Sequence, residues 1–423
     1  MRKRYNSYKD SGVEWIGEIP SHWIKGKWGY YYNSGMGSTI LKEDLVENGE
    51  VPVYSATEED RIFGYINNPK LILNEGDIVI PARGNSIGHV KLISSKSTTS
   101  QTTIYSKSKD ENLDSRYSYY YCKGNKTNLF PFIQTAIPQI TVTEISFNPI
   151  IIPPLSEQQQ IVSYLDTKTS LIDSLIEKTQ RKIELLKEKR TSLINELVTK
   201  GLNPNVEMKD SGVEWIGEIP SHWKTGKLYQ YSEMSNGSTP SRVKPEYWEN
   251  GTIPWMSSGE INKKKIREID GRITKEGFEN SSTKLLPIGT VMMGLNGQGK
   301  TKGTVGILEI ETTCNQSLCG MIFKDVIYPM FSYYYLDSQY YHIRGLVGEG
   351  QREGISVSFL GRYPFVVPPL SEQQQIVSHL DEQTQLIDNT ISIEEKRIEL
   401  LKEYRQSLIS EVVTGKLKVT TDE

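Results

Sequence analysis

The chain has 423 residues, of which 36% are hydrophobic and 24% are charged, and its formal net charge is −3. This length allows two or three domains with their own hydrophobic cores, and no apolar run approaches the ~20 residues of a membrane span. The near-neutral charge excludes binding by bulk electrostatic attraction, so a nucleic-acid partner would have to meet local basic patches.

Neither the start of the chain nor its cysteines point to export. Met1–Asn6 leads into polar sequence and not into a secretory apolar segment, so we expect a cytoplasmic protein. Cys122, Cys314 and Cys319 are too few and too irregularly spaced for a disulfide framework or a zinc site, and we expect them to be buried thiols. The five histidines show no metal-ligand spacing. We therefore predict no metal site.

Two stretches of the sequence occur twice. Lys9–Trp23 is identical to Lys209–Trp223, and Pro153–Ser163 returns unchanged at Pro368–Ser378. The first pair lies 200 positions apart and the second pair 215, so the sequence between them differs in length. Duplication followed by divergence of the middle segments explains this arrangement.

The first middle segment, about 24–150, contains short apolar runs separated by turn residues. We predict strands there at Leu71–Leu73, Asp77–Pro81, His89–Ile93 and Thr102–Tyr105, and a helix at Arg116–Cys122. The second middle segment, about 224–367, has a parallel pattern. Its predicted strands are Ile253–Met256, Thr290–Met293, Thr304–Leu308 and Gly320–Phe323, and its predicted helix is Met330–Ser338.

Short similarities connect the two middle segments. Three pairs match: Gly37–Thr39 with Gly237–Thr239, Ser118–Tyr121 with Ser332–Tyr335, and Gln139–Val142 with Gly354–Val357. The two segments are thus expected to share a fold while their surfaces differ. Paired recognition modules for two different targets would have this property.

Each copy of the Pro153–Ser163 sequence begins a long helical pattern. The apolar seam of the first helix consists of Ile161, Leu165, Ile172, Leu175, Leu186, Leu193 and Leu197, and that of the second of Ile376, Leu380, Ile387, Leu401, Leu408 and Val412. Ile176, Ile183, Ile194, Ile391 and Ile398 widen these faces. A helix from about Ser156 to Thr199 would be roughly 60 Å long. Because it cannot bury its own apolar stripe, we expect it to pack against its copy and to separate two globular modules.

One segment formally matches a phosphate-binding loop. Gly294–Thr301 fits the pattern G-x-x-x-x-G-K-[ST] and follows a predicted strand. A phosphate site also needs a following helix, but Lys302–Leu308 is rich in glycine and β-branched residues and predicts a strand. The equivalent Pro81–Gly88 keeps a glycine-rich turn without the Lys-Thr pair. We therefore favour a hairpin loop, with nucleotide binding through Lys300 and Thr301 as an alternative.

Polar loops are the best candidates for a functional surface, since no set of residues forms a recognisable active site. Their Arg, Lys, Asn, Gln, Ser and Thr side chains are of the kinds that contact base edges and phosphates. The run Lys263–Arg267 is either a local patch of this kind or a solvated face. The candidate DNA-binding residues are Ser38, Thr39, Arg83, Asn85, Ser86, Gln101, Ser238, Thr239, Arg242, Asn296, Gln298, Lys300, Lys302, Gln316 and Arg352.

The repeated motifs resemble those of the specificity subunit of Type I restriction-modification systems. The matching features are W-I-G-E-I-P-x-x-W at the head of each half, P-P-L-x-E-Q-Q-x-I-V at each helix start, and the helix endings Ile183–Thr199 and Ile398–Thr414. The resemblance implies two target-recognition domains that each read one half of a split DNA sequence. Because the two middle segments differ in sequence, we expect this target to be asymmetric and non-palindromic. It also implies that the repeated helices form an antiparallel coiled coil that sets the gap between the halves.

The resemblance further implies a non-catalytic chain without a cofactor of its own. Two methyltransferase subunits would carry S-adenosylmethionine and methylate adenine, and restriction subunits would use ATP and Mg to translocate and cleave double-stranded DNA. Consistently, the chain has no N/D-P-P-Y/F string. The other alternative to a DNA-specificity subunit is a coiled-coil adaptor that binds protein partners.

We therefore expect an α+β protein with an internal pseudo-two-fold repeat, in which two β-rich target-recognition domains with short helices are joined by the two long helices. The expected domain bounds are 1–152 for the first recognition domain, 153–205 for the first spacer helix and 206–367 for the second recognition domain. The second spacer helix is expected at 368–418 and a tail at 419–423.

Overall fold

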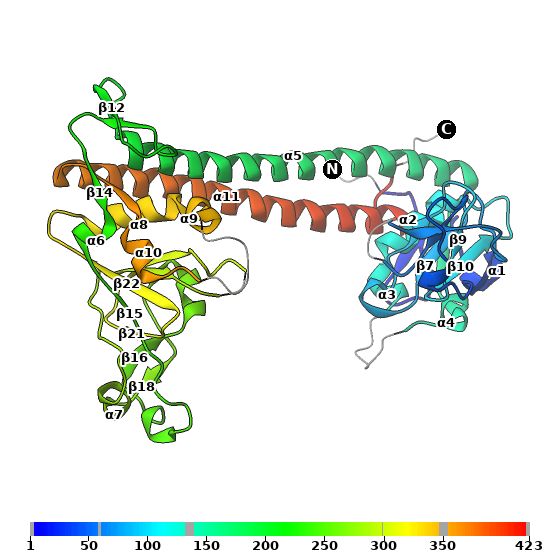
Figure 1. Ribbon diagram of the computed structural model, residues 1–423. Coiled ribbons are helices and arrows are strands. Elements are labelled where there is room, and N and C mark those ends of the chain that lie inside the picture. Colours follow the sequence, from blue (N-terminus) through cyan, green and yellow to red (C-terminus); the bar gives the residue numbers. More distant parts are fainter. Residues whose placement is uncertain (1–3, 58–60, 132–138, 298, 347–353, 420–423) are drawn as a thin grey trace. The chain divides into compact units, whose positions relative to one another are not determined.

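The computed structural model describes residues 4–57, 61–131, 139–297, 299–346 and 354–419 (Figure 1). The chain divides into two compact units. The first unit consists of 1–181 together with 394–423, and the second of 182–393. Within the described ranges, no helix combines the length and the hydropathy needed to cross a bilayer.

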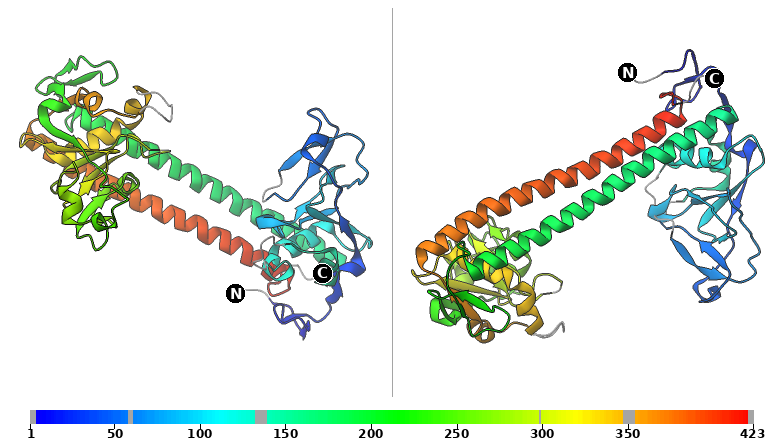
Figure 2. Two further views of the ribbon diagram at one scale, coloured as in Figure 1. Left: turned by 60° about the horizontal axis from the view of Figure 1, so that its bottom comes forward. Right: turned by 90° about the horizontal axis from the view of Figure 1, so that it is seen from above.

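Two long helices contribute to both units. Helix α5 (Leu155–Lys200) and helix α11 (Leu370–Val413) lie side by side within each unit, as both views of Figure 2 show. In the first unit, Nε of Arg405 lies 2.9 Å from Oδ1 of Asp173. In the second, Nε of Arg190 lies 3.0 Å from Oδ1 of Asp388. Because the start of each helix meets the end of the other, the predicted antiparallel pairing is confirmed.

The apolar seam of the two helices is buried over most of its length. Ile161, Leu165, Ile172, Leu408 and Val412 are buried in the first unit, and Leu197, Ile376, Leu380 and Ile387 in the second. The residues that widen the face contribute as well, since Ile183, Ile194 and Ile391 are buried. The remaining seam residues, Leu175, Leu186, Leu193 and Leu401, are half-buried. The contact surface is thus broader than a two-position heptad seam.

The first unit contains a β-rich module built on a four-stranded antiparallel sheet with the order β4-β10-β7-β8. Its core combines Ile78, Ile80 and Ile104 of the sheet with Tyr117 and Tyr121 of helix α2. The strands of this sheet are β4 (Tyr32–Met36), β7 (Ile78–Pro81), β8 (Lys91–Leu92) and β10 (Thr103–Ser108). A second sheet, β6-β5-β9, consists of β5 (Val51–Tyr54), β6 (Ile62–Ile66) and β9 (Thr98–Thr99).

Two-stranded sheets and short helices complete the first module. The pairs are β1 (Tyr8–Asp10) with β2 (Glu18–Pro20), and β3 (Ile24–Lys27) with β11 (Pro149–Ile152). The helices are α1 (Trp28–Tyr31), α2 (Ser115–Gly124), α3 (Lys126–Leu129) and α4 (Val142–Phe147), with 3-10 turns η1 (Lys42–Asp44) and η2 (Gly84–Ser86).

The second unit repeats this architecture with an extended sheet. Its main sheet has the order β15-β22-β19-β20-β17, in which β17 pairs parallel to β20. The strands are β15 (Ser232–Asn236), β17 (Lys265–Ile266), β19 (Val291–Gly294), β20 (Val305–Leu308) and β22 (Leu318–Phe323). The smaller sheet, β18-β16-β21, consists of β16 (Ile253–Met256), β18 (Arg272–Ile273) and β21 (Thr313–Cys314).

The remaining strand pairs of the second unit also have counterparts in the first. Strand β12 (Met208–Asp210) pairs with β13 (Glu218–Pro220), and β14 (Lys224–Lys227) pairs with β23 (Pro364–Val367). The short helices are α6 (Leu228–Tyr231), α7 (Lys275–Glu279), α8 (Pro329–Ser338), α9 (Tyr340–Leu346) and α10 (Val357–Gly361), with 3-10 turns η3 (Pro245–Tyr247) and η4 (Ser258–Lys263). The predicted shared fold of the two halves is confirmed.

The predicted strands and helices agree with the structure except at Leu71–Leu73, but short strands of both modules were not predicted. Leu71–Leu73 is not a strand, since only Leu73 forms an isolated bridge, with Ser97. Strands β4, β5 and β6 were missed. Asn33–Gly35 gives β4 little apolar character, and Pro52 interrupts β5, a residue that normally argues against a strand. Pairing with β10 and β9 overrides these local signals.

The repeated sequence at each helix start attaches the module to its long helix. Gln158 is fully buried, and its carboxamide accepts a hydrogen bond from the backbone N–H of Asp114 at 2.8 Å and donates to the carbonyl of Pro153 at 2.8 Å. Gln373 makes the same bonds with Tyr328 and Pro368 in the second unit. These bonds explain why a buried polar residue stands at this position.

The neighbouring glutamate of the same repeat binds the repeated head. In the first unit, Glu157 accepts a hydrogen bond from Nε1 of Trp23 at 3.2 Å and contacts His22. In the second unit, Glu372 accepts one from Trp223 at 3.1 Å. The two sequence repeats thus bind each other, which accounts for their occurring together in both halves.

Candidate nucleic-acid interface

Three loops meet at one edge of the main sheet in the first unit. Strands β4 and β7 end at Met36 and Pro81, and β10 begins at Thr103, which is opposite Pro81 in the register. Because Ile104 of β10 pairs with Met36, all three loops leave the sheet on the same side. They carry the candidate residues Ser38, Thr39, Arg83 and Gln101, which we call the first three-loop edge.

Hydrogen bonds fix the relative positions of these loops. The backbone N–H of Ile40 donates to Oε1 of Gln101 at 2.9 Å, and that of Ser38 donates to the carbonyl of Thr99 at 2.9 Å. The N–H of Ala82, next to Arg83, donates to the carbonyl of Thr102 at 3.0 Å. Ser38 and Gln101 are 63 positions apart in the sequence, and the sheet brings them together.

The second unit forms an equivalent edge from Ser238, Thr239, Asn296 and Gln316, which we call the second three-loop edge. Thr239 donates through Oγ1 to Oε1 of Gln316 at 2.6 Å, and the N–H of Ser238 donates to the carbonyl of Cys314 at 3.0 Å. The N–H of Leu295, next to Asn296, donates to the carbonyl of Ser317 at 2.8 Å. Each bond has a counterpart in the first unit, so Arg83 and Asn296 occupy equivalent positions.

The repeated Gly-Ser-Thr sequence has a steric cause. A Cβ atom on Gly37 would clash with the carbonyl oxygen of Ser100, and one on Gly237 would clash with that of Cys314. Only glycine lets the chain pass this close to the neighbouring backbone. The short similarity noted in the sequence is therefore a packing requirement that places the following Ser and Thr in each edge.

The remaining candidates of the first unit lie close to its edge but differ in exposure. Asn85 is exposed within the turn η2. Ser86 is buried, with 5% of its surface exposed, and lies 3.5 Å from the carbonyl of Arg83. The structure therefore contradicts Ser86 as a surface contact, because its side chain closes the turn that carries Arg83.

In the second unit, Arg242 is exposed and lies over the ring of Trp248 at 5.5 Å. Trp248 packs edge-on against Trp255, whose Nε1 donates to the carbonyl of Ser238. Arg242 is thereby connected with the second three-loop edge. The two tryptophans are not among the candidate residues, although Trp248 lies between a candidate arginine and a predicted strand and Trp255 lies within that strand.

The candidate lysines of the second unit follow Asn296 in the loop between β19 and β20. The carbonyl of Lys300 accepts a hydrogen bond from Tyr340, and that of Lys302 accepts one from Arg344, so α9 holds this loop. Lys300 is exposed and lines a pocket of about 1000 Å³ with Arg344 and Tyr341. Lys302 is only 6% exposed, so the structure contradicts it as a surface contact. Gln298 and Arg352 lie outside the described residues.

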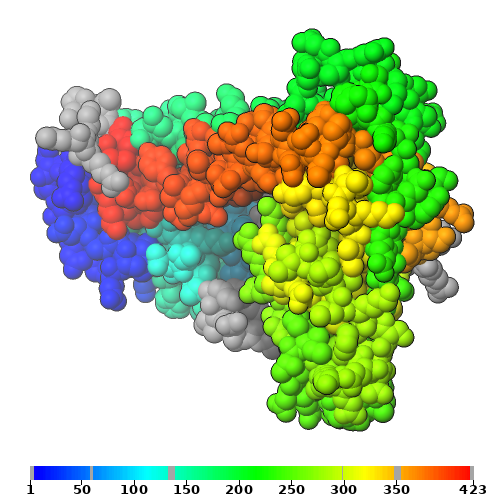
Figure 3. Space-filling view, turned by 90° about the vertical axis from the view of Figure 1, so that its left-hand side faces the viewer, coloured from blue at the N-terminus to red at the C-terminus, as the bar shows by residue number. Residues whose placement is uncertain are grey.

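The run Lys263–Arg267 is matched by carboxylates from several elements. Lys264 lies 2.5 Å from Asp337 of α8, and Lys265 lies 3.8 Å from Asp381 of α11. Arg267 lies 2.5 Å from Glu309, and this contact raises the pKa of the guanidinium. The run therefore connects the module with helices α8 and α11, which Figure 3 shows in contact as the yellow and orange segments of the second unit.

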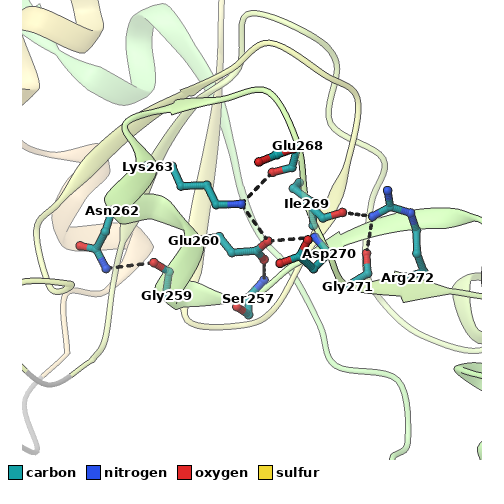
Figure 4. A network of polar contacts seen from close by, with 10 residues as sticks. All are labelled: Ser257, Gly259, Glu260, Asn262, Lys263, Glu268, Ile269, Asp270, Gly271 and Arg272. Carbon is teal, nitrogen blue, oxygen red and sulfur yellow. Dashed lines mark hydrogen bonds and ion pairs between the residues drawn. The ribbon is translucent and has the colours of Figure 1, made fainter.

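Glu260 organises the turn that carries the lysine run. Its carboxylate accepts hydrogen bonds from the backbone N–H groups of Ser257 at 2.8 Å and Asp270 at 3.2 Å (Figure 4). Lys263 lies 4.0 Å from the same carboxylate and donates to the carbonyl of Glu268 at 3.2 Å. With its charges paired in this way, the segment has the properties of a structural turn and not of an open basic patch.

The formal phosphate-binding loop does not have the geometry that nucleotide binding requires. Gly294–Thr301 connects β19 to β20, and these strands pair antiparallel as a hairpin. Strand β20 begins at Val305, where a phosphate site would need the start of a helix. Among the described residues, no group of three or more His, Cys, Asp or Glu side chains is placed to hold a metal ion.

The cysteines are buried, as expected. Burial raises the pKa of Cys314 and of Cys319 to about 12, and it raises the pKa of Cys122 still further. A thiol with such a pKa carries almost no thiolate at neutral pH. These side chains are therefore packed, protonated thiols at neutral pH.

The sequence profile of the Type I restriction modification DNA specificity domain matches the chain twice, over residues 22–185 and 220–403. The specificity subunit of the Type I restriction enzyme MjaVIII of Methanocaldococcus jannaschii is 27% identical over 418 residues, covering 95% of this chain and 94% of the relative. The EcoR124I/EcoR124II specificity subunit of Escherichia coli is 28% identical over 265 residues, 60% of each chain.

Solved structures share the fold. A chain from a study of complex assembly and conformational transition of the type I R-M system superimposes with a TM-score of 0.73 at 15% identity, covering 94% of this chain and 99% of that one. The HsdS subunit of Thermoanaerobacter tengcongensis gives a TM-score of 0.55 at 14% identity, covering 94% and 98%. At these identities the likeness concerns the arrangement of the elements alone.

Proposed function

Since this chain belongs to the Type I restriction modification DNA specificity family, as a specificity subunit without catalysis of its own, we propose that it reads a split, asymmetric DNA sequence. Each half of the sequence is read by one of the two three-loop edges. The two long helices set the spacing between the halves.

The equivalence of the two three-loop edges carries this proposal. Both edges have Ser-Thr in one loop and Gln in another, and each has a polar side chain that can donate hydrogen bonds at the third position. That position is Arg83 in the first edge and Asn296 in the second, and both side chains are exposed. Arginine is suited to guanine and asparagine to adenine. The same scaffold would therefore read two different half-sites.

The long helices supply a surface that suits two copies of one partner. Leu171 and Leu386 occupy the same position of the repeat and are 60% and 55% exposed; Leu185 and Leu400 occupy another and are 48% and 53% exposed. Each unit thus presents one exposed leucine from each of these two pairs. Single exposed leucines are common, but their recurrence at equivalent positions supports a repeated contact, which we assign to two methyltransferase subunits.

The proposed complex would obtain its chemistry from these partners. The methyltransferase subunits would supply S-adenosylmethionine and adenine methylation, and restriction subunits, where present, would supply ATP- and Mg-dependent translocation and cleavage. With a net charge of −3, the chain itself attracts DNA only weakly at long range. We therefore place DNA binding in the assembled complex, in the cytoplasm.

Genome-wide adenine methylation tests this function directly. Cells that express the methyltransferase subunit of the same system are compared with and without this chain. Methyltransferase expression is verified in both. The expected result is a split motif that disappears when the chain is deleted. An unchanged methylome would contradict the proposal and favour a coiled-coil adaptor that binds protein partners.

A further inference from the structure

We propose that Gln101 and Gln316 are paired specificity-determining residues, and that each presents its amide NH₂ group to a hydrogen-bond acceptor on a base edge in the major groove. This inference rests on the proposed function and adds the chemical group that each edge shows to the DNA. It follows from which atoms of the two amides are already bound within the protein.

The carbonyl end of Gln101 is assigned by its partner. A backbone N–H can only donate, so the atom that lies 2.9 Å from the N–H of Ile40 must be the oxygen Oε1. This contact fixes which end of the amide points inward, a choice that is otherwise ambiguous for glutamine. The nitrogen Nε2 therefore points away from Ile40.

Within the described part of the chain, Nε2 of Gln101 has no protein partner and is not a buried, unsatisfied atom. It is consequently open to solvent on a half-buried side chain. An amide that is held at one end and free at the other loses little further freedom on binding, which favours a specific contact.

Gln316 shows a related arrangement in the second unit, in which a side-chain hydroxyl takes the place of the backbone N–H. Its Oε1 accepts a hydrogen bond from the hydroxyl of Thr239 at 2.6 Å, and among described residues its Nε2 makes no hydrogen bond. The residue is exposed and stands two positions after strand β21, as Gln101 stands two positions after strand β9. In each edge the partner of the amide is supplied by the loop that begins with Gly-Ser-Thr.

The free NH₂ group determines which bases are compatible. In the major groove, guanine, adenine and thymine offer acceptors, namely O6 and N7, N7, and O4, whereas cytosine offers only its amino donor. Each half-site is therefore expected to exclude cytosine at the base that its glutamine contacts. In the minor groove every base offers an acceptor, so a contact there would not discriminate in this way.

The substitution Gln→Glu separates this role from a structural one. Gln101→Glu keeps the acceptor for Ile40 but replaces the outward NH₂ with a second acceptor oxygen, whereas Gln101→Ala removes both. Gln316→Glu and Gln316→Ala make the same comparison in the second edge. Asn236→Asp is the charge control, since Asn236 is an exposed residue at the end of β15, beside the second edge.

Each variant is assembled with the methyltransferase, and genome-wide adenine methylation is read as a sequence motif. We expect both Gln→Glu variants to retain the wild-type melting temperature and to lower methylation of the native motif roughly tenfold or more. Gln101→Glu should relax or change one base in one half of the motif, and Gln316→Glu one base in the other half. Asn236→Asp should leave the motif unchanged.

Two results would overturn the inference while leaving the proposed function intact. One is an unchanged motif methylated at the wild-type rate by both Gln→Glu variants. The other is a uniform loss of methylation at all sequences with base preferences unchanged, which would indicate a phosphate contact or a folding role. A wild-type complex that methylates no split motif would instead contradict the proposed function itself.

Discussion

The hydroxyl of Tyr334 donates a hydrogen bond to Oδ1 of Asp381 at 2.7 Å and so joins helix α8 of the second module to helix α11. In the first unit, Tyr120 of α2 makes the same bond with Asp166 of α5, also at 2.7 Å. A cation accompanies each aspartate, Lys265 in the second unit and Arg116 in the first. The same contact therefore contributes to the orientation of each module on its long helix.

We predict that Tyr334→Phe lowers the free energy of unfolding by about 1 kcal/mol, because one hydrogen bond to a partly exposed carboxylate is lost. A double-mutant cycle with Asp381→Ala, which removes the acceptor, should give a coupling energy of similar size. Chemical denaturation measures both quantities. Tyr341→Phe is the control, since Tyr341 is 81% exposed. Additive effects of Tyr334→Phe and Asp381→Ala would contradict the assigned contact.

A larger effect is expected from the buried glutamine at the start of each long helix. Gln158→Leu would leave the N–H of Asp114 and the carbonyls of Pro153 and Asn112 without their partner, at a cost of roughly 2–4 kcal/mol. The neighbouring Gln159 is exposed, so Gln159→Leu should change stability by less than about 0.5 kcal/mol. Melting temperatures of the two variants test this, and equal values would contradict it.

The long helices could be predicted from sequence because their signal is local. Apolar residues at three- and four-residue steps occur over tens of positions, and α5 begins and ends within one residue of the predicted Ser156–Thr199. The buried glutamines gave no such signal, since Gln158 looks like any polar residue in a helix. Its occurrence in an exact repeat was the only indication that it has a structural role.

The candidate site was predicted as residues but not as an arrangement. Ser38, Thr39 and Gln101, like Ser238, Thr239 and Gln316, were named because polar side chains in glycine-rich loops suit DNA contacts. That they meet depends on strand pairs such as β4 with β10, whose partners are distant in sequence and whose register depends on packing. The burial of Ser86 and Lys302 depends on the same long-range contacts, and no local pattern indicated it.

Alkaline pH should destabilise the fold through its buried thiols and tyrosines. Burial raises the pKa of Cys314 and Cys319 from 9.0 to about 12, and that of Tyr120 from 10.0 to about 12. These groups ionise more readily in the unfolded chain, so their stabilising contribution is complete below about pH 9 and is lost as the pH rises from 9 to 12. The denaturant concentration at the midpoint of unfolding, measured from pH 8 to 11, should fall steadily above pH 9. A flat profile over this range would contradict the burial of these side chains.

The glycine of each Gly-Ser-Thr loop offers the most direct connection between packing and recognition. Gly237→Ala would place a methyl group against the carbonyl of Cys314, which lies in the backbone and cannot turn aside as a flexible side chain would. The loop must then shift, and Ser238 and Thr239 shift with it. Methylation specificity should be lost in one half of the motif, and Gly37→Ala should affect the other half.

Gly259→Ala is the matched control, because a Cβ atom at Gly259 meets nothing within 4 Å. The melting temperature of each variant shows whether the module remains folded, and the motif read from the methylome shows which half-site is affected. If Gly237→Ala kept both halves of the motif at wild-type rates, this loop would not contribute to reading DNA. Loss of specificity in one half by a folded variant would assign that half-site to the second three-loop edge.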